Sequence, residues 1–281
     1  MTGKLYLCAT PIGNLEDITY RVLRILKEVD LIGAEDTRHS RNLMNYFDIH
    51  TPMTSYHEYN KVDKARYLVE EMQKGKNIAL ITDAGTPGIS DPGEELVRQC
   101  HEAGIEVSSV PGPAACITAL TMSGLPTRRF AFEAFLPSDK KERQNVLNDL
   151  KNETRTIVMY EAPHHLLRTM KELLEVLGDR ELTLCKELTK IHERAEKGML
   201  ADLIEKYDHA EIRGEYVLVI QGKSFAELEE ESQERFREMT LEDHMKLYVA
   251  QGMSEKDAMK RVAKDRGISK RDVYAEIHIM K

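Results

Sequence analysis

The chain has 281 residues, 41% hydrophobic and 31% charged, a balance typical of a folded soluble protein rather than a disordered or fibrous one. This length favours two compact domains with a small appendage over one domain. A formal net charge of -8 excludes a protein that coats nucleic acid indiscriminately, because neutralising phosphates needs many cationic groups. Any contact with nucleic acid must therefore come from local basic patches.

Neither export nor a membrane anchor is expected from the sequence. The first residues run directly into a short apolar segment, and the longest apolar runs fall far short of a bilayer span. The four cysteines, at positions 8, 100, 116 and 185, form no CxxC pair and have no nearby histidine at metal-ligand spacing. We therefore expect buried free thiols and no metal site.

Strand and helix patterns alternate along the first part of the chain. Strands are expected at 4–10, 31–34, 78–82 and 106–110. Asn60 can cap a helix that Gly75 closes, and Asp91 with Pro92 can supply the N-cap and first turn of another. The alternation predicts an α/β domain with a largely parallel sheet, covering residues 1–123.

A break at Ser123–Thr127 separates a second α/β unit, expected to cover residues 124–223. Its strands are expected at 130–135, 156–160, 181–186 and 216–220, with a strongly amphipathic helix between the second and third. Antiparallel pairing is more plausible here because some connections are short or irregular. Residues 224–281 then predict a small helical domain, in which an acidic run from Glu227 to Glu238 precedes three helical patterns.

Three loops stand out because each follows an expected strand and opens a helix, where open parallel sheets bind ligands. They cover residues 9–14, 82–93 and 110–115 and are rich in glycine and proline. Each alone could be an ordinary turn, but three that converge suit a flat nucleoside ligand. The sequence lacks the glycine-rich fingerprints of dinucleotide and triphosphate sites, which weakens the dehydrogenase and NTPase hypotheses.

Ten ordered sequence blocks cover essentially the whole chain and carry a family resemblance. They are ATPIGNLEDIT from Ala9, AEDTRHSR from Ala34, SYHEYN from Ser55, TDAGTPGISDPG from Thr82, VPGPAA from Val110, GLPTRRFAFEAFLP from Gly124, YEAPHHLL from Tyr160, KELTKIHE from Lys186, RGEYVLVIQG from Arg213 and KDAMKRVAKDRGISKRDVY from Lys256. Together they resemble the bacterial 16S ribosomal RNA (cytidine-2'-O)-methyltransferases, the ribosomal small subunit methyltransferase I family of the tetrapyrrole methylase superfamily.

The resemblance implies a tetrapyrrole-methylase-like (class III methyltransferase) fold, with S-adenosylmethionine held between two α/β domains. It also implies a homodimer that methylates a decoding-centre cytidine of 16S rRNA in the small ribosomal subunit. The residues carried over to the cofactor are Pro11, Asp83, Gly85, Thr86, Ala114 and Ala115 from the first domain, and Tyr160, Glu187 and Gly214 from the second.

Two positions depart from the family pattern. Ala114 stands where a serine is usual, so backbone contacts must replace a hydroxyl that could bond the cofactor. Ala134 stands where glycine is common, which we expect only to shift packing.

Methyl transfer to a ribose hydroxyl requires in-line alignment and a group that polarises the hydroxyl. Lys186 and Glu187, at an expected strand end, are the first candidates, and Lys186→Ala should then abolish turnover but keep cofactor binding. A solvated strand end or salt bridge is an equally plausible interpretation. The runners-up are Glu35, Asp36, Arg38 and His39, although Asp36 could simply cap the next helix.

The expected RNA contacts are basic residues around the cleft, with the C-terminal helices as a second contact. They are Arg38, Arg41, Arg128, Arg129, Lys140, Lys141 and Arg143. Two other hypotheses stay open. The same fold could act on a tetrapyrrole or a protein acceptor, or the chain could be a non-catalytic, cofactor-binding module for ribosome assembly.

Overall fold

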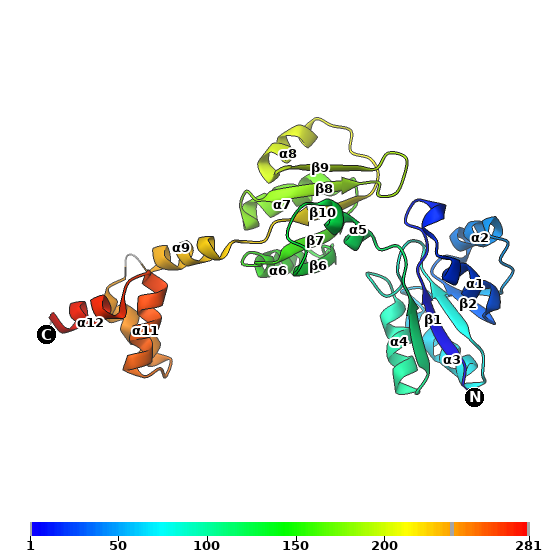
Figure 1. Ribbon diagram of the computed structural model, residues 1–281, viewed down its shortest axis with the longest axis horizontal. Coiled ribbons are helices and arrows are strands. Elements are labelled where there is room, and N and C mark those ends of the chain that lie inside the picture. Colours follow the sequence, from blue (N-terminus) through cyan, green and yellow to red (C-terminus); the bar gives the residue numbers. More distant parts are fainter. Residues whose placement is uncertain (1, 237–238, 280–281) are drawn as a thin grey trace. The chain divides into compact units, whose positions relative to one another are not determined.

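The computed structural model describes residues 2–236 and 239–279. The chain divides into two compact units, one formed by Met1–Asn148 with Thr156–Gln221 and the other by Asp149–Arg155 with Gly222–Lys281. Two α/β sheets make up the larger unit, and helices make up most of the smaller (Figure 1). The predicted fold class, two α/β regions followed by a helical region, is therefore confirmed.

The first sheet contains five parallel strands in the order β3-β2-β4-β1-β5. The strands are β1 Lys4–Cys8, β2 Leu31–Ala34, β3 Met53–Ser55, β4 Ile78–Ile81 and β5 Glu106–Val110. The helical elements between them are η1 Leu15–Asp17, α1 Tyr20–Glu28, α2 Thr37–Tyr46, α3 Lys61–Gln73 and α4 Gly93–Glu102.

Both faces of this sheet are covered, as a parallel sheet requires. Alternate residues of β4 belong to different cores: Ile78 and Leu80 pack with α3 and α4, and Ala79 and Ile81 with α1 and α2. The buried run of β4 therefore follows from its central place in the sheet.

The chain order reverses direction at the neighbouring strands β1 and β4. After β1 the chain continues to β2, on the far side of β4, whereas after β4 it continues to β5, on the far side of β1. Where the chain order reverses in this way, the loops after the two neighbouring strands lead apart and leave a crevice at the carboxyl ends of the strands. The fold thus predicts ligand sites beside Thr10 and Thr82.

The second sheet has the order β6-β7-β10-β8-β9. Its strands are β6 Phe130–Phe135, β7 Thr156–Glu161, β8 Glu181–Lys186, β9 Arg194–Met199 and β10 Tyr216–Ile220. Its helices are α5 Ala115–Met122, α6 Lys140–Leu150, α7 Leu166–Leu177 and α8 Leu200–Asp208. β6 and β7 pair in parallel, and the other three pairings are antiparallel, which confirms the preference expected for this half. The edge strand β9 was not predicted.

The described residues of the smaller unit form the helices α9 Phe225–Arg235, α10 Leu241–Ala250, α11 Glu255–Arg266 and α12 Lys270–Ile279. The three predicted helical patterns correspond to α10, α11 and α12, which share one apolar core. The acidic run itself forms α9, which a Ser224–Glu227 capping box begins. The last two residues of that run, 237 and 238, lie outside the described residues.

All four cysteines are buried free thiols, as predicted. Among residues 2–236 and 239–279, no helix is long and apolar enough to cross a membrane.

Candidate active site

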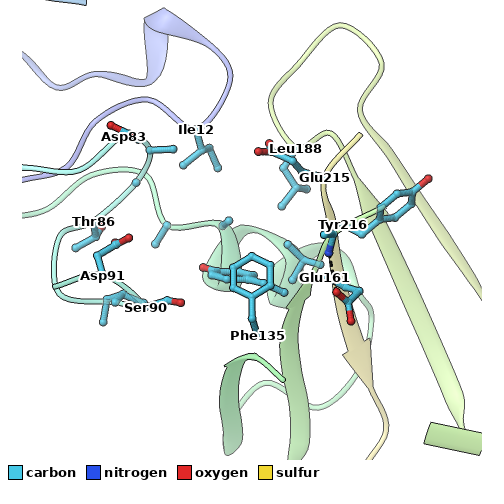
Figure 2. Close-up of a pocket in the computed structure, with 18 of the residues that line it drawn as sticks. Ile12, Asp83, Thr86, Ser90, Asp91, Phe135, Glu161, Leu188, Glu215 and Tyr216 are labelled. Carbon is cyan, nitrogen blue, oxygen red and sulfur yellow. Dashed lines mark hydrogen bonds between the residues drawn. The ribbon is translucent and has the colours of Figure 1, made fainter. Parts of the chain in front are cut away.

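A pocket of about 540 Å³ lies at the carboxyl ends of the first sheet and is completed by residues of the second. The loop after β4 lines one side with Asp83, Thr86 and Asp91 (Figure 2). Leu188 and Glu215, which belong to the second sheet's connections, lie opposite. Such a volume, with a mixed apolar and polar lining, matches the usual size of a small-molecule site.

Six of the nine residues that the resemblance assigns to cofactor binding in the two domains line this pocket. They are Asp83, Gly85, Thr86, Ala114, Ala115 and Tyr160. Pro11 lines a second, adjoining pocket instead. Gly214 lines neither pocket and lies directly against the Glu187 side chain.

Backbone and side-chain hydrogen bonds hold the three loops together. The amide of Thr10 donates to the Gly85 carbonyl at 2.9 Å, and the Gly85 amide donates to the Thr10 carbonyl at 3.1 Å. The Thr86 hydroxyl donates to the carbonyl of Pro113 at 2.9 Å. The convergence expected from the sequence is thus produced by direct contacts between the loops, which fixes the pocket wall in advance.

Five acidic residues line the first pocket: Glu35, Asp83 and Asp91 on the side of the first sheet, and Glu161 and Glu215 on the side of the second. Burial, with the charges of Glu35 and Asp83, raises the pKa of Asp91 to about 7. Burial also raises the pKa of Glu35, although the hydrogen bond from the Asp83 amide lowers it in part. The Asp36 amide donates to Asp83 Oδ1 at 3.2 Å. The negative potential of this group favours a cationic ligand.

Asp91 is the site residue that the sequence assigned to a different role. The expectation that it caps α4 was wrong, because Pro92 is the N-cap and the helix begins at Gly93. One residue farther from the helix, the Asp91 carboxyl lines the pocket. Its position within the glycine- and proline-rich loop 82–93 was the sequence feature that could have indicated this role.

Aromatic rings form the opposite wall. Tyr160 lies 5.0 Å from the ring of Phe132 and 5.5 Å from that of Phe135, measured between centroids. The Tyr160 hydroxyl accepts a hydrogen bond from the Cys116 amide at 3.2 Å, and burial raises the pKa of that hydroxyl. Fixed rings beside a cavity suit a flat ligand.

Ala134, beside Phe135, has φ +46°, so the usual glycine is replaced at a left-handed position and not merely at a packing position.

The first catalytic candidates line neither pocket. Glu187 accepts hydrogen bonds from the Glu215 amide at 2.8 Å and from Lys190 Nζ at 3.0 Å. The bond from the Glu215 amide is the main cause that lowers the Glu187 pKa, and Lys190 contributes further. Lys186 Nζ lies 5.7 Å from the ring centroid of Tyr216. The geometry gives these two residues a supporting position behind the pocket wall.

The predicted RNA contacts differ in accessibility. Arg38, Arg41, Arg128, Arg129, Lys140 and Lys141 are exposed. Arg143 is only 8% exposed and donates to Glu172 Oε2 and to the Thr169 hydroxyl, each at 2.6 Å. Arg143 therefore braces helices α6 and α7 and is not available to RNA in this structure.

Asp36 has the capping role that the sequence allowed as an alternative. It is the N-cap of α2, and its Oδ1 accepts from the Arg38 amide at 2.8 Å. Hydrogen bonds from the Arg38 side chain and amide lower the pKa of Asp36 to about 2. Arg38 is thereby tied at the start of the helix, and neither residue lines the first pocket.

A second pocket of about 490 Å³ adjoins the first. It is lined by the loop after β1, by one face of α2 and by the start of the loop after β4. The second sheet's connections contribute Lys190 and Glu215. The residues common to both pockets are Ile12, Asp83, Ala84 and Glu215.

Comparison with solved structures identifies the fold. The chain matches uroporphyrin-III C-methyltransferase from Thermus thermophilus with a TM-score of 0.56 and 22% identity, over 78% of this chain and 94% of that one. It matches diphthine synthase with a TM-score of 0.62 and 14% identity, over 78% and 90% of the two chains. The family model described as Tetrapyrrole (Corrin/Porphyrin) Methylases matches residues 4–204. The chain is a tetrapyrrole-methylase-type methyltransferase, and its cofactor is S-adenosylmethionine.

Closer relatives define the branch of that family. The ribosomal RNA small subunit methyltransferase I of Halalkalibacterium halodurans is 45% identical over 98% of this chain and 95% of its own length. The proteins of the same name from Bacillus subtilis and Synechocystis are 44% and 46% identical, over 99% and 97% of this chain and 94% and 96% of their own lengths. The chain belongs to the ribosomal RNA small subunit methyltransferase I family.

Proposed function

We propose that this protein methylates the ribose 2'-hydroxyl of a decoding-centre cytidine in 16S rRNA, within the small ribosomal subunit, using S-adenosylmethionine. The observation that carries the proposal is the 44–46% identity to small subunit methyltransferases over nearly the whole chain. The convergence of six expected cofactor residues on one pocket supports it independently.

The first pocket fits the cofactor in size, shape and charge. The aromatic wall suits its flat adenine ring, and the carboxyls of Glu35, Asp83 and Asp91 suit its positively charged groups. Asp83, Gly85, Thr86, Ala114, Ala115 and Tyr160 would hold it. Bound there, S-adenosylmethionine supplies an electrophilic methyl group on a sulfonium centre.

The chain's own contribution begins with alignment. Hydrogen bonds between the loops around Thr10, Gly85 and Thr86 keep one wall of the pocket rigid. A rigid wall can hold the reacting groups in line without a rearrangement of the protein during the reaction. The apolar side chains of Ile12 and Leu188 line the pocket and would limit water beside the bound methyl donor. Exclusion of water also strengthens the electrostatic effect of the three carboxyls.

Glu35 is the group that we propose takes the proton of the acceptor hydroxyl. Its half-buried carboxyl lines the pocket, and burial raises its pKa, so it is a stronger base than an ordinary glutamate. Lys186 and Glu187, the first candidates from the sequence, are proposed as positioning residues, because they contact the segment Glu215–Tyr216 from behind.

Kinetics of three variants separate these roles. Glu35→Gln should lower kcat by about 10²-fold or more while the Kd for S-adenosylmethionine changes little. Lys186→Ala should keep most of the turnover, contrary to the expectation from sequence alone. The matched control Glu28→Gln changes an exposed glutamate on α1 and should leave both constants unchanged. Loss of turnover in Lys186→Ala with Glu35→Gln still active would reverse the assignment.

The function itself is tested with labelled methyl from S-adenosylmethionine. We expect transfer to unmethylated small subunits, with naked 16S RNA assayed in parallel, and 2'-O-methylcytidine after nucleoside mapping. Cofactor binding without any transfer to either substrate would contradict the proposal and favour a tetrapyrrole or protein acceptor, or a binding module for ribosome assembly.

RNA contacts are proposed for the exposed residues Arg38, Arg41, Arg128 and Arg129, with Lys140 and Lys141 at the start of α6. The helical region 224–281 is proposed as a further RNA contact. Deleting the segment after Phe225 should weaken subunit binding and spare cofactor affinity; equal loss of both would contradict this role.

A homodimer is also proposed, and sedimentation equilibrium tests it.

A further inference from the structure

We propose that the second pocket receives the acceptor cytidine, flipped out of its RNA context so that its ribose meets the first pocket at their shared wall. This inference rests on the proposed function and adds the site at which that acceptor binds. The second pocket, of about 490 Å³, is in the range of nucleotide-sized sites. A nucleotide flipped out of its stack, as base-modifying enzymes bind it, needs a receptacle of this size.

The location of this pocket is the first argument. It lies between the loops after β1 and β4, at the point where the chain order of the sheet reverses. Ile12 and Asp83 line both pockets, and Figure 2 shows them at one edge of the first. An acceptor in the second pocket therefore approaches the methyl donor through that edge, without crossing the carboxyl group of Asp91.

The close approach of two segments gives the pocket a fixed boundary. A Cβ atom at Gly13 would lie 2.5 Å from Lys190 Cγ and 2.9 Å from the Leu188 carbonyl, so only glycine lets the two segments meet. Lys190 is held in place by Glu215 at 2.7 Å and Glu187 at 3.0 Å. Its ammonium group is thus a positioned donor on the pocket wall.

A buried hydroxyl is the second argument. Ser40 is 2% exposed and lines the pocket, and within the described parts of the chain its Oγ has no hydrogen-bond partner. An unpaired buried hydroxyl is unfavourable, so a ligand that forms a hydrogen bond with the Ser40 hydroxyl gains from this site. His39 and Asn42, from the same helix, add polar groups that can read the edge of a base.

The outer part of the pocket suits stacking. His39, Leu43 and Tyr46 recur at positions i, i+4 and i+7 of α2 and so form one face, which lines the pocket. Tyr46 is 67% exposed, and its ring packs edge-on against Phe47 at a centroid distance of 4.9 Å. A positioned, exposed aromatic ring is the usual platform for an unstacked RNA base.

Positive charge beside this face fits the phosphates that flank a flipped nucleotide. Arg38 and Arg41 lie on the same helix, and the Arg38 side chain is 90% exposed. Its guanidinium is oriented by Asp36 Oδ2 at 3.0 Å. An exposed arginine at the start of the helix that carries the stacking face favours an RNA substrate over an uncharged small molecule.

The site is tested by steady-state kinetics with whichever substrate, small ribosomal subunits or naked 16S RNA, accepts the methyl group. Ser40→Ala should lower kcat/KM for the acceptor about tenfold, and Tyr46→Ala by about tenfold to hundredfold, with the Kd for S-adenosylmethionine unchanged in both. Ser40→Ala removes an unpaired hydroxyl, so it should not impair folding. Tyr20→Ala removes a 93% exposed tyrosine that lines neither pocket and is the control. Unchanged acceptor kinetics in both pocket variants, or a weakened cofactor Kd, would overturn the proposal.

A fluorescence measurement keeps the site and the reaction distinguishable. The chain contains no tryptophan, so Tyr46→Trp introduces at the pocket a single tryptophan, which can be excited selectively over the tyrosines. Saturating cytidine 5'-monophosphate should quench it, whereas Tyr20→Trp should not respond. Quenching without methyl transfer to RNA would refute the proposed function and leave the site standing. Methyl transfer without quenching would refute the site and leave the function standing.

Discussion

Gly214→Ala tests how the wall of the first pocket is supported. Gly214 has φ +87°, and a Cβ atom built there would lie 2.7 Å from Glu187 Cγ and 2.8 Å from its Cδ and Oε1. The glutamate cannot move aside freely, because Oε1 accepts from the Glu215 amide at 2.8 Å and from Lys190 at 3.0 Å. The substitution therefore opposes both the backbone conformation and a hydrogen-bonded carboxylate.

These two effects set the expected magnitude. An L-residue in the left-handed region costs about 1–2 kcal/mol. Loss of a hydrogen bond to a charged group costs about 1.5–3 kcal/mol, and the 21% exposure of the Glu187 side chain favours the lower end. We expect unfolding free energy to fall by about 3 kcal/mol. Affinity for S-adenosylmethionine should also fall, since Glu215 and its two successors line the pocket.

Urea unfolding and calorimetric titration with S-adenosylmethionine measure both quantities. Gly104→Ala is the matched control, because Gly104 has φ +66° but nothing lies within 4 Å of the added Cβ atom. It should lose only about 1–2 kcal/mol and keep its cofactor affinity. Equal destabilisation in the two variants, or unchanged cofactor affinity in Gly214→Ala, would refute the supporting role of Glu187.

Three further changes test other parts of the larger unit. Ala134→Gly relieves a left-handed φ of +46° and should raise the free energy of unfolding by about 0.5 kcal/mol, measured in urea. The contribution of Asp91 to stability should fall as pH rises from about 4 to about 7, because the native Asp91 retains a proton that the unfolded chain releases. Asp91→Asn should remove this contribution, and parallel curves of stability against pH for the two proteins would contradict the raised pKa. Arg143→Ala should destabilise the protein by about 2 kcal/mol, because it removes the 2.6 Å hydrogen bonds to Glu172 and Thr169 while Arg168 still pairs with Glu172, whereas Arg129→Ala should change subunit affinity only.

Four strands of the parallel sheet could be predicted because their signals are local. The clearest is the apolar run Ile78–Ile81, and the four are separated by helical patterns or turn residues. The strand Met53–Ser55 was not predicted, because it has only three residues and all are partly buried. The edge strand Arg194–Met199 could not be found in the same way. Its residues are mostly exposed or partly exposed, as is usual for a strand with a free edge, so no alternation of buried and polar residues marks it.

Burial of charged groups was the property least accessible from sequence. Arg143 resembles its exposed neighbours Lys140 and Lys141 in a linear reading, because all lie in one charged helix. Only the packing of α6 against α7 places Thr169 and Glu172 within hydrogen-bond reach of it. Asp91 illustrates the same difficulty, since the rule that favours aspartate before a helix says nothing about neighbouring carboxyls from other loops.

The direction of side chains along a strand explains why the first catalytic candidates differ from the residues that line the pocket. In β10, Val217 pairs with Cys185 of β8, and both belong to the core beneath α5, the face on which the pocket lies. Successive residues of a strand point to opposite faces, so Lys186 points away from that face together with its partner Tyr216. Figure 2 accordingly shows the Tyr216 ring directed away from the pocket. A sequence motif can therefore predict that a residue lies near the site, but the position of the residue along its strand determines whether its side chain points into the pocket.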